Sequence, residues 1–290
     1  MSFRDRFQNL KETVGQWTDS AGGGSLDRQI ERNLAEMEGG TEIERTAAVK
    51  ALVIQAQTDD KWADPIITSF LRVLPDQLAS PQEAIIDGLL ELRKVKVSRE
   101  EEIFESIQET LDSPYPSVRS KVVDIWTRFS LKSDAKASDT IAVLFEMLSD
   151  DDKDVRYQTQ ESLSKILHTV PKVALPELKN AIGDDDWRVT YHSIVLLTEF
   201  AKKYPGPSVA LAPEVMEAFN SGERLKERAA DCIGVLGLAN PEAVKSAVPG
   251  LIKGLESKSS ELRKACATAL GRIGSKNGMV VYHAVPRLAR

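Results

Sequence analysis

The sequence predicts an all-α solenoid of about seven stacked helix pairs. A β-branched or leucine residue, usually followed by a base, recurs at intervals of 34 to 37 positions, at Val118, Val155, Val189, Leu225 and Leu262. A period of this length is typical of helical repeats that bury their apolar faces only by stacking on their neighbours. Aromatic residues make up only 6% of the chain, which suits helix pairs packed through aliphatic seams. Such a fold offers a long surface for binding.

The composition also limits where the protein works. No run of about 18 apolar residues is present, so no membrane-spanning helix is expected. The segment after Met1 lacks the apolar core of a secretory signal. Cys232 and Cys266 fall within predicted second helices, where we interpret them as small buried hydrophobes. These features predict a cytoplasmic protein in a reducing compartment, with a location at a membrane surface as the alternative.

The first element expected is an amphipathic helix over residues 1–19. Its apolar residues recur at spacings of 4, 3, 4 and 3 and share one face: Phe3, Phe7, Leu10, Val14 and Trp17. A glycine-rich linker over 20–25 follows, and the solenoid itself is expected over 26–290. The linker predicts that this helix is tethered to the stack.

Three roles are open for this N-terminal helix. It could cap the exposed end of the first repeat, as solenoids require. It could bind a partner's groove or form oligomers through its apolar face. It could also lie on a membrane surface, although residues 2–18 carry three bases against two acids, a weak attraction for anionic lipid.

The next two helices are predicted from their faces and caps. Ile30, Leu34 and Met37 share one face of a helix over about 26–38, which two glycines end. Thr41 and Glu44 then have the spacing of a capping box, so a second helix should begin directly after Thr41.

The remaining first helices of each pair are expected to open near prolines, which suit a first helical turn: Pro65, Pro176, Pro213, Pro249 and Pro286. Acid-rich turns, such as 150–152 and 184–186, should separate each first helix from its second helix.

The segments 154–163 and 261–274 carry the repeated motif most clearly, and with them the chain resembles HEAT repeats over roughly residues 41–290. The resemblance implies a right-handed superhelix whose second helices line the concave face. It also implies that turn aspartates cap the second helices and pair with bases of neighbouring repeats. The bases of this structural ladder would be Arg119, Arg156 and Arg263. In one repeat the base has moved, because Arg188 precedes Val189 and Thr190 takes the usual position.

Helical phase predicts which residues of the second helices face outward. Counted from each anchor, positions two, six and nine point away from the buried stripe. The candidates for partner binding on the concave face are Tyr157, Glu161, Tyr191, Val195, Asp231 and Lys264. The residues at position nine are Thr127, Ser164, Thr198, Gly234 and Gly271. Tyr157 and Tyr191 are equivalent in adjacent repeats, and exposed aromatics are common at binding hot spots.

No catalytic or metal-binding motif stands out, and no cofactor is expected. His168, His192 and His283 lie far apart and lack metal-ligand spacing. The aspartate runs lack the alternating ligands of a Ca²⁺ loop. Among HEAT-like enzymes, deoxyhypusine hydroxylase requires His-Glu pairs that this chain lacks. HEAT-like DNA glycosylases require a basic channel. HEAT-like bilin lyases have no sequence motif by which they could be tested. The pairs Gly234/Gly237 and Gly271/Gly274 indicate helix packing, not a phosphate loop.

We therefore predict a non-enzymatic scaffold or adaptor that binds protein partners through its solenoid surface and its N-terminal helix, with its oligomeric state open. One alternative is a peripheral membrane coat or tether protein acting through residues 1–18. Another is nucleic-acid binding through residues 221–290, which carry 12 bases against 6 acids in a chain of net charge −6. A HEAT-like lyase is the remaining alternative.

Overall fold

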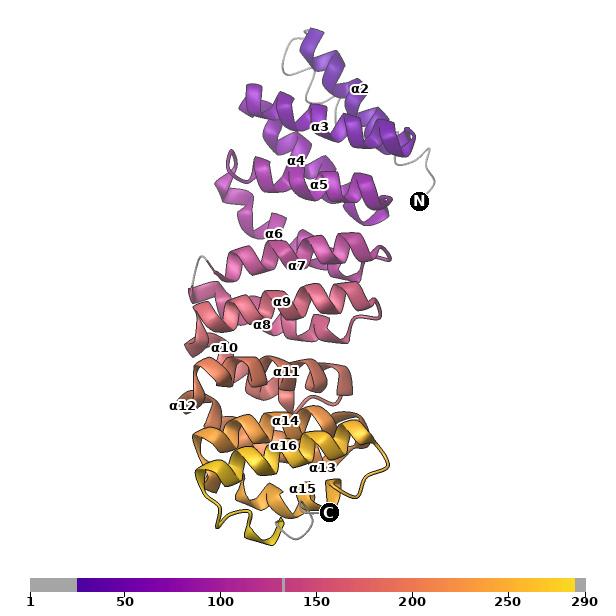
Figure 1. The fold of residues 1–290 in the computed structure, drawn as a ribbon. Coiled ribbons are helices and arrows are strands. Elements are labelled where there is room, and N and C mark those ends of the chain that lie inside the picture. Colours follow the sequence, from indigo (N-terminus) through magenta and orange to yellow (C-terminus); the bar gives the residue numbers. More distant parts are fainter. Residues whose placement is uncertain (1–24, 132–133, 285–290) are drawn as a thin grey trace. The chain divides into compact units, whose positions relative to one another are not determined.

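The structure of the protein is a computed structural model that describes residues 25–131 and 134–284 (Figure 1). These residues form helices and short 3-10 turns, with no strand among them. The chain divides into two compact units, Met1–Val122 and Val123–Arg290. The predicted N-terminal helix and most of its linker lie outside the described residues.

Helix pairs in chain order build unit 1. Its helices are α2 (Ser25–Gly39), α3 (Glu42–Thr58), α4 (Ala63–Val73), α5 (Ala79–Leu92), α6 (Glu100–Glu109) and the first part of α7 (Pro116–Ser130). Ile30, Leu34 and Met37 of α2 are at most 1% exposed, as their shared face predicts. Their burial anchors α2 against the stack.

The capping box at the start of α3 is confirmed. The Thr41 hydroxyl accepts a hydrogen bond from the Glu44 amide at 3.4 Å, and the Glu44 carboxylate accepts one from the Thr41 amide at 2.8 Å. The Thr41 hydroxyl also donates to the Glu44 carboxylate at 2.9 Å. The bonds that the Thr41 amide and hydroxyl donate lower the pKa of Glu44, since they stabilise its ionised form. The box satisfies two backbone amides that have no partner within the helix.

Unit 2 continues the same pattern (Figure 1). After the end of α7, its helices are α8 (Asp134–Glu146), α9 (Lys153–Thr169), α10 (Pro171–Ile182), α11 (Trp187–Lys203), α12 (Pro205–Ser208), α13 (Ala212–Ser221), α14 (Glu223–Ala239), α15 (Val248–Gly254) and α16 (Ser260–Lys276). Helices α9, α11, α14 and α16 are the second helices, and each packs beside the next. The described residues thus contain seven consecutive helix pairs, from α2–α3 to α15–α16, in agreement with the predicted fold.

The buried stripe follows the predicted phase. The five anchors Val118, Val155, Val189, Leu225 and Leu262 are all at most 6% exposed. In α9 the stripe continues through Thr159, Ser162, Leu163 and Ile166, which are fully or almost fully buried. Two residues at position nine are corrections, since Thr127 and Gly234 are buried, Gly234 against Ala269 of α16, whereas Gly271 at the same position is exposed as predicted.

The prolines bear out the prediction in part. Pro213 and Pro249 lie in the first turns of α13 and α15, where a missing amide costs no intrahelical bond. Pro176 does not open its helix, because α10 begins at Pro171 and carries Pro176 in its interior. Pro286 lies outside the described residues.

Glycines bring α14 and α16 close together. A Cβ atom on Gly234 would lie 2.8 Å from the Cα of Ala269, and one on Gly237 would lie 2.5 Å from a side-chain carbon of Ile273. Any larger residue would push the two helices apart. This packing role agrees with the interpretation of these glycines as helix contacts.

Both cysteines are free and buried, as expected. Burial raises the pKa of the Cys232 thiol to about 12 and that of Cys266 to about 11. Within the described ranges, no helix is both long and apolar enough to cross a bilayer.

Candidate functional site

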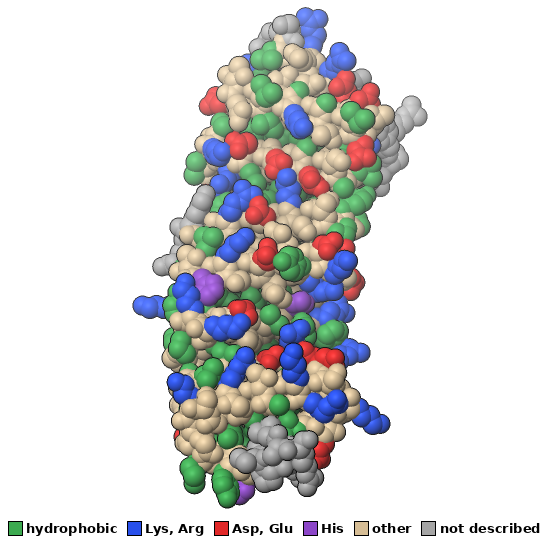
Figure 2. All heavy atoms as spheres, in the orientation of Figure 1, with side chains coloured by type: hydrophobic (Ala, Val, Ile, Leu, Met, Phe, Trp, Pro, Cys, Tyr) green, Lys and Arg blue, Asp and Glu red, His purple; other side chains and the backbone are tan. Residues whose placement is uncertain are grey.

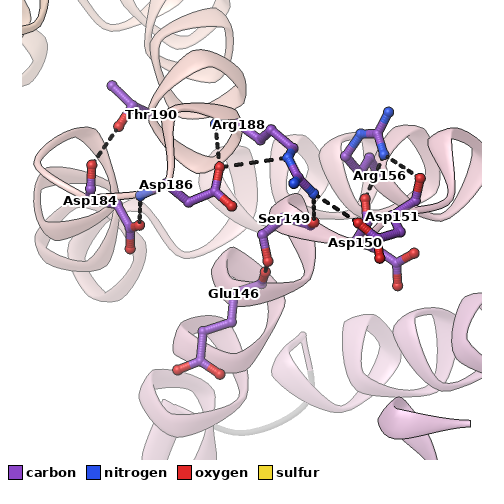
Figure 3. A network of polar contacts seen from close by, with 9 residues as sticks. All are labelled: Glu146, Ser149, Asp150, Asp151, Arg156, Asp184, Asp186, Arg188 and Thr190. Carbon is purple, nitrogen blue, oxygen red and sulfur yellow. Dashed lines mark hydrogen bonds and ion pairs between the residues drawn. The ribbon is translucent and has the colours of Figure 1, made fainter.

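The turn between α8 and α9 shows how the repeated motif is used (Figure 3). Asp152 caps α9, since its Oδ1 accepts hydrogen bonds from the amides of Asp154 at 2.8 Å and Val155 at 3.2 Å. Asp150 in turn accepts a bond from the Asp152 amide at 2.8 Å. The Arg156 guanidinium donates to the backbone carbonyls of Asp150 and Asp151. Carboxylates and base together fasten the turn to its own second helix.

The other two bases of the expected ladder act in the same way. Arg119 donates to the carbonyl of Ser113 at 2.6 Å, and Arg263 donates to the carbonyls of Ser257 at 2.7 Å and Lys258 at 3.0 Å. In each case a guanidinium satisfies a carbonyl six residues earlier. The expected pairing with a carboxylate of a neighbouring repeat is therefore wrong for Arg156 and Arg263, which bind carbonyls of their own turns.

The displaced base makes the connection between repeats (Figure 3). Thr190 occupies the usual position of the base, and its hydroxyl donates to the Asp184 carbonyl at 3.0 Å, again six residues earlier. Arg188 is thereby released and reaches the preceding turn. It donates there to the carbonyl of Ser149 and forms an ion pair with Asp151 at 3.2 Å. A shift of two residues along the chain thus gives this base a contact between repeats, in addition to its 3.7 Å ion pair with Asp186 of its own turn.

We call the outward surface of α9, α11, α14 and α16 the second-helix face. Tyr157 is its most exposed aromatic residue, with 62% of its surface accessible. Its hydroxyl donates to Glu161, one turn along the same helix, at 3.3 Å. Glu161 is also exposed, whereas Val195 is half-buried. Tyr157 therefore presents a ring on a rigid helix, held by a weak contact with its own helix.

Tyr191, although equivalent in sequence, is half-buried between repeats. The Arg228 Nε donates to its hydroxyl at 3.0 Å, and the Arg228 guanidinium lies 5.7 Å from the ring centroid. One turn earlier, the Arg224 guanidinium lies 4.8 Å from the ring of Trp187. Two cation–π contacts, one turn apart, thus join α14 to α11.

Sequence reasoning missed this double contact, although a signal was present. Trp187 and Tyr191 are four residues apart, and so are Arg224 and Arg228. Each arginine also follows its aromatic partner by 37 positions, one more than the 36 that separate the anchors Val189 and Leu225. Residues at nearly the same phase in adjacent repeats lie close together, so this spacing could have predicted both pairs.

A second polar contact joins α9 to α11. The His192 Nδ1 and the Gln160 Oε1 lie 2.6 Å apart. Burial, followed by the positive charge of Arg156, lowers the pKa of His192. A neutral imidazole at this position keeps the contact free of a second positive charge beside Arg156.

The other predicted residues are scattered. Asp231 is half-buried on α14 and Lys264 is exposed on α16. The N-terminal set, Phe3, Phe7, Leu10, Val14 and Trp17, lies outside the described residues. Of the predicted set, Tyr157 and Glu161 are therefore the two exposed residues in mutual contact.

The basic region 221–290 does not gather into one large patch on the face in view. Figure 2 shows acidic and basic side chains interspersed there. Lys226 pairs with Glu223, and Lys245 pairs with Glu242 at 3.3 Å. Over the described ranges, no group of three or more His, Cys, Asp and Glu side chains is placed to hold a metal ion.

Comparisons with known proteins agree with this architecture. A family model of HEAT repeats matches residues 104–199, and a model of a HEAT-like repeat matches residues 223–273. No curated protein matches the sequence.

Several solved structures share the fold. Kap121p bound to RanGTP has a TM-score of 0.60 at 15% identity, over 95% of this chain and 34% of its own. Kap95p with RanGDP has a TM-score of 0.56 at 15% identity, over 92% and 38% of the two chains. Importin beta has a TM-score of 0.55 at 14% identity, over 88% and 37%. The chain thus spans little more than a third of the length of these proteins, and identities this low establish the fold alone.

Proposed function

Because this chain belongs to the HEAT-repeat family, we propose that it is a non-enzymatic scaffold that binds a protein partner through the second-helix face of unit 2. The observation that carries this proposal is Tyr157, a ring 62% exposed on a well-packed helix. Tyrosine offers a large contact area at a small cost in side-chain entropy, and it is enriched at binding hot spots.

The packing beneath Tyr157 supports a preformed surface. Val155 and Leu163 on the opposite side of α9 are fully buried, and Asp152 and Arg156 hold the start of the helix. A partner would therefore meet a ring whose backbone is already fixed, which lowers the entropy lost on binding.

The structural use of the charged motif also favours a scaffold. The aspartates and arginines that repeat along the chain cap helices and bind turn carbonyls, so the fold itself employs them. Two of the solved structures with this fold hold protein partners, RanGTP on Kap121p and Nup1 on Kap95. Protein binding is thus compatible with a fold of this kind.

The N-terminal helix over residues 1–19 is part of the proposal as a second recruiting element. Its five apolar residues on one face suit a partner's groove, and the short linker would hold that partner near the solenoid. We also propose a cytoplasmic location, in keeping with two free, buried cysteines.

Photo-crosslinking from single positions tests the binding surface. The full chain would carry p-benzoylphenylalanine in place of Tyr157, and a matched chain would carry it in place of Tyr282, which is 66% exposed elsewhere in unit 2. After irradiation in native extract, we expect a discrete protein adduct from position 157 alone. The Tyr157→Ala chain should then retain less of that protein in a pull-down, with an unchanged melting curve.

Two results would contradict the proposal. Identical adducts from both positions would indicate contact by collision, and the absence of any adduct at position 157 would show that no partner covers the ring. A parallel pull-down with a chain that starts at Ser25 tests the N-terminal helix. If that chain retains the same proteins as the full chain, the recruiting role of residues 1–19 is wrong.

A further inference from the structure

A groove of about 670 Å³ opens in unit 2 between the turn that precedes α11 and the turn that precedes α14. Its floor is apolar, because Ile182, Ala218 and Leu225 line it and are themselves almost completely buried. Trp187 forms part of the wall and is 42% exposed. The groove can thus accept the aliphatic part of a side chain or of an extended segment.

The rim of the groove is acidic. Five carboxylates and one guanidinium line it, a formal net charge of −4: Asp184, Asp185, Glu214, Glu217, Glu223 and Arg224. Lysines outside the lining balance two of the five, since Lys179 pairs with Glu214 at 3.1 Å and Lys226 pairs with Glu223. The three remaining carboxylates outnumber the single lining cation. Charge complementarity therefore selects a basic occupant.

The groove already holds one cation of its own. The Arg224 guanidinium lies 4.8 Å from the centroid of the Trp187 ring, at a distance typical of a cation–π contact. Both residues line the groove and both are exposed. The Trp187 ring is thus in a position to bind a guanidinium. In the free chain Arg224 provides this group, and in a complex an arginine of the partner could take its place.

We propose that this groove binds a short, extended, basic segment of a protein partner. An arginine or lysine of that segment would replace Arg224 on the Trp187 ring, and two further cations would pair with Asp185 and Glu217. The aliphatic stems of these side chains would lie on the apolar floor. Arg224 then competes with the partner from within the chain. This groove is separate from the surface around Tyr157, so an experiment can contradict either proposal without affecting the other.

The test uses the full chain and a defined probe. The probe is a fluorescein-labelled octapeptide of alternating arginine and leucine, titrated at low salt and followed by fluorescence anisotropy. We expect the Asp185→Asn, Glu217→Gln double variant to bind about fourfold to 25-fold more weakly, since each exposed ion pair contributes about twofold to fivefold. Arg224→Gln should bind at least about twofold more tightly, because it removes both the competitor and a like charge.

The matched control is the Asp151→Asn, Asp154→Asn double variant, which removes the same number of charges from exposed positions of unit 2 outside the groove. Its affinity should equal that of the unchanged chain. A loss as large as that of the Asp185→Asn, Glu217→Gln variant would show that only the net charge matters, and would overturn the proposal. So would tighter binding of a glutamate–leucine octapeptide, no binding of the basic probe, or weaker binding by Arg224→Gln. Thermal unfolding confirms that each variant is folded.

Discussion

Three consecutive aspartates, 150–152, look alike in the sequence, yet the structure predicts very different costs for removing them. Asp152 accepts two hydrogen bonds from backbone amides at the start of α9, at 2.8 Å and 3.2 Å. Asp151 is 98% exposed at its side chain and makes one ion pair, with Arg188. Substitution of Asp152 by alanine should therefore destabilise unit 2, whereas substitution of Asp151 should hardly matter.

The magnitudes follow from these contacts. Loss of an N-cap that satisfies otherwise unpaired amides costs about 1–2 kcal/mol in the free energy of unfolding. An ion pair with a fully exposed carboxylate contributes less than about 0.5 kcal/mol, because water and salt screen it. With a urea dependence of about 2–3 kcal/mol/M, Asp152→Ala should lower the unfolding midpoint by about 0.5 M. Asp152→Asn should recover most of this loss, because asparagine caps helices nearly as well as aspartate.

Urea unfolding followed by circular dichroism measures the global effect, and hydrogen exchange locates it. In Asp152→Ala the amides of Asp154 and Val155 should exchange faster, while those of α14 should remain as protected as before. Equal midpoints for the alanine variants of Asp151 and Asp152 would refute the assignment of Asp152 as the cap. So would a failure of asparagine to restore stability.

Three further predictions concern single sites. Gly234→Val should lower the free energy of unfolding in urea by about 2–3 kcal/mol, because its Cβ would lie 2.8 Å from the Cα of Ala269. Gly271→Ala should be neutral or stabilising by up to about 1 kcal/mol, because its Cβ would meet nothing within 4 Å. Because burial raises the pKa of the Cys232 thiol to about 12, we expect a native chain at about pH 8 to leave it unmodified by a disulfide reagent until urea unfolds it; reaction at the rate of a free thiol would contradict the packing. Burial and Arg156 lower the pKa of His192 in the folded chain. In the unfolded chain the His192 pKa is about 6.5, so as the pH falls the unfolded chain binds a proton at His192 before the folded chain does. His192 should then reduce stability as the pH falls below about 6.5, and His192→Gln should flatten the decline in unfolding free energy between about pH 7.5 and 5.5; parallel pH profiles would exclude this origin.

Much of the fold could be predicted because local rules and packing agree. The anchor Val155 and the capping box at Thr41 lie where the periodicity and the cap signature place them. Pro176 shows where such reasoning fails, since two prolines five residues apart both suit a helix start and only packing decides between them. Here Pro171 begins the helix, and α10 tolerates Pro176 in its interior.

The candidate site was less predictable, because it depends on what the neighbouring repeat supplies. Tyr157 and Tyr191 share a phase, but α14 places Arg228 on the ring of Tyr191, whereas Glu161 on the same helix contacts Tyr157 at a marginal 3.3 Å. Helical phase predicts the direction in which a side chain points, but not whether a residue of the neighbouring repeat packs over it. The arginines of the motif were similarly ambiguous, since a guanidinium such as that of Arg156 can bind a carbonyl of its own turn or a distant carboxylate.

The link made by Arg188 has a consequence for how unit 2 loses its structure. A repeat array unfolds as a row of units, whose cooperativity depends on how strongly each one favours order in the next. Arg188 ties α11 to the Ser149 carbonyl, so the α10–α11 pair cannot melt without releasing a group in the preceding turn. The guanidinium groups of Arg156 and Arg263 instead donate to backbone carbonyls within their own repeats. The α8–α9 and α10–α11 pairs should therefore lose their order together, in one step, when unit 2 unfolds.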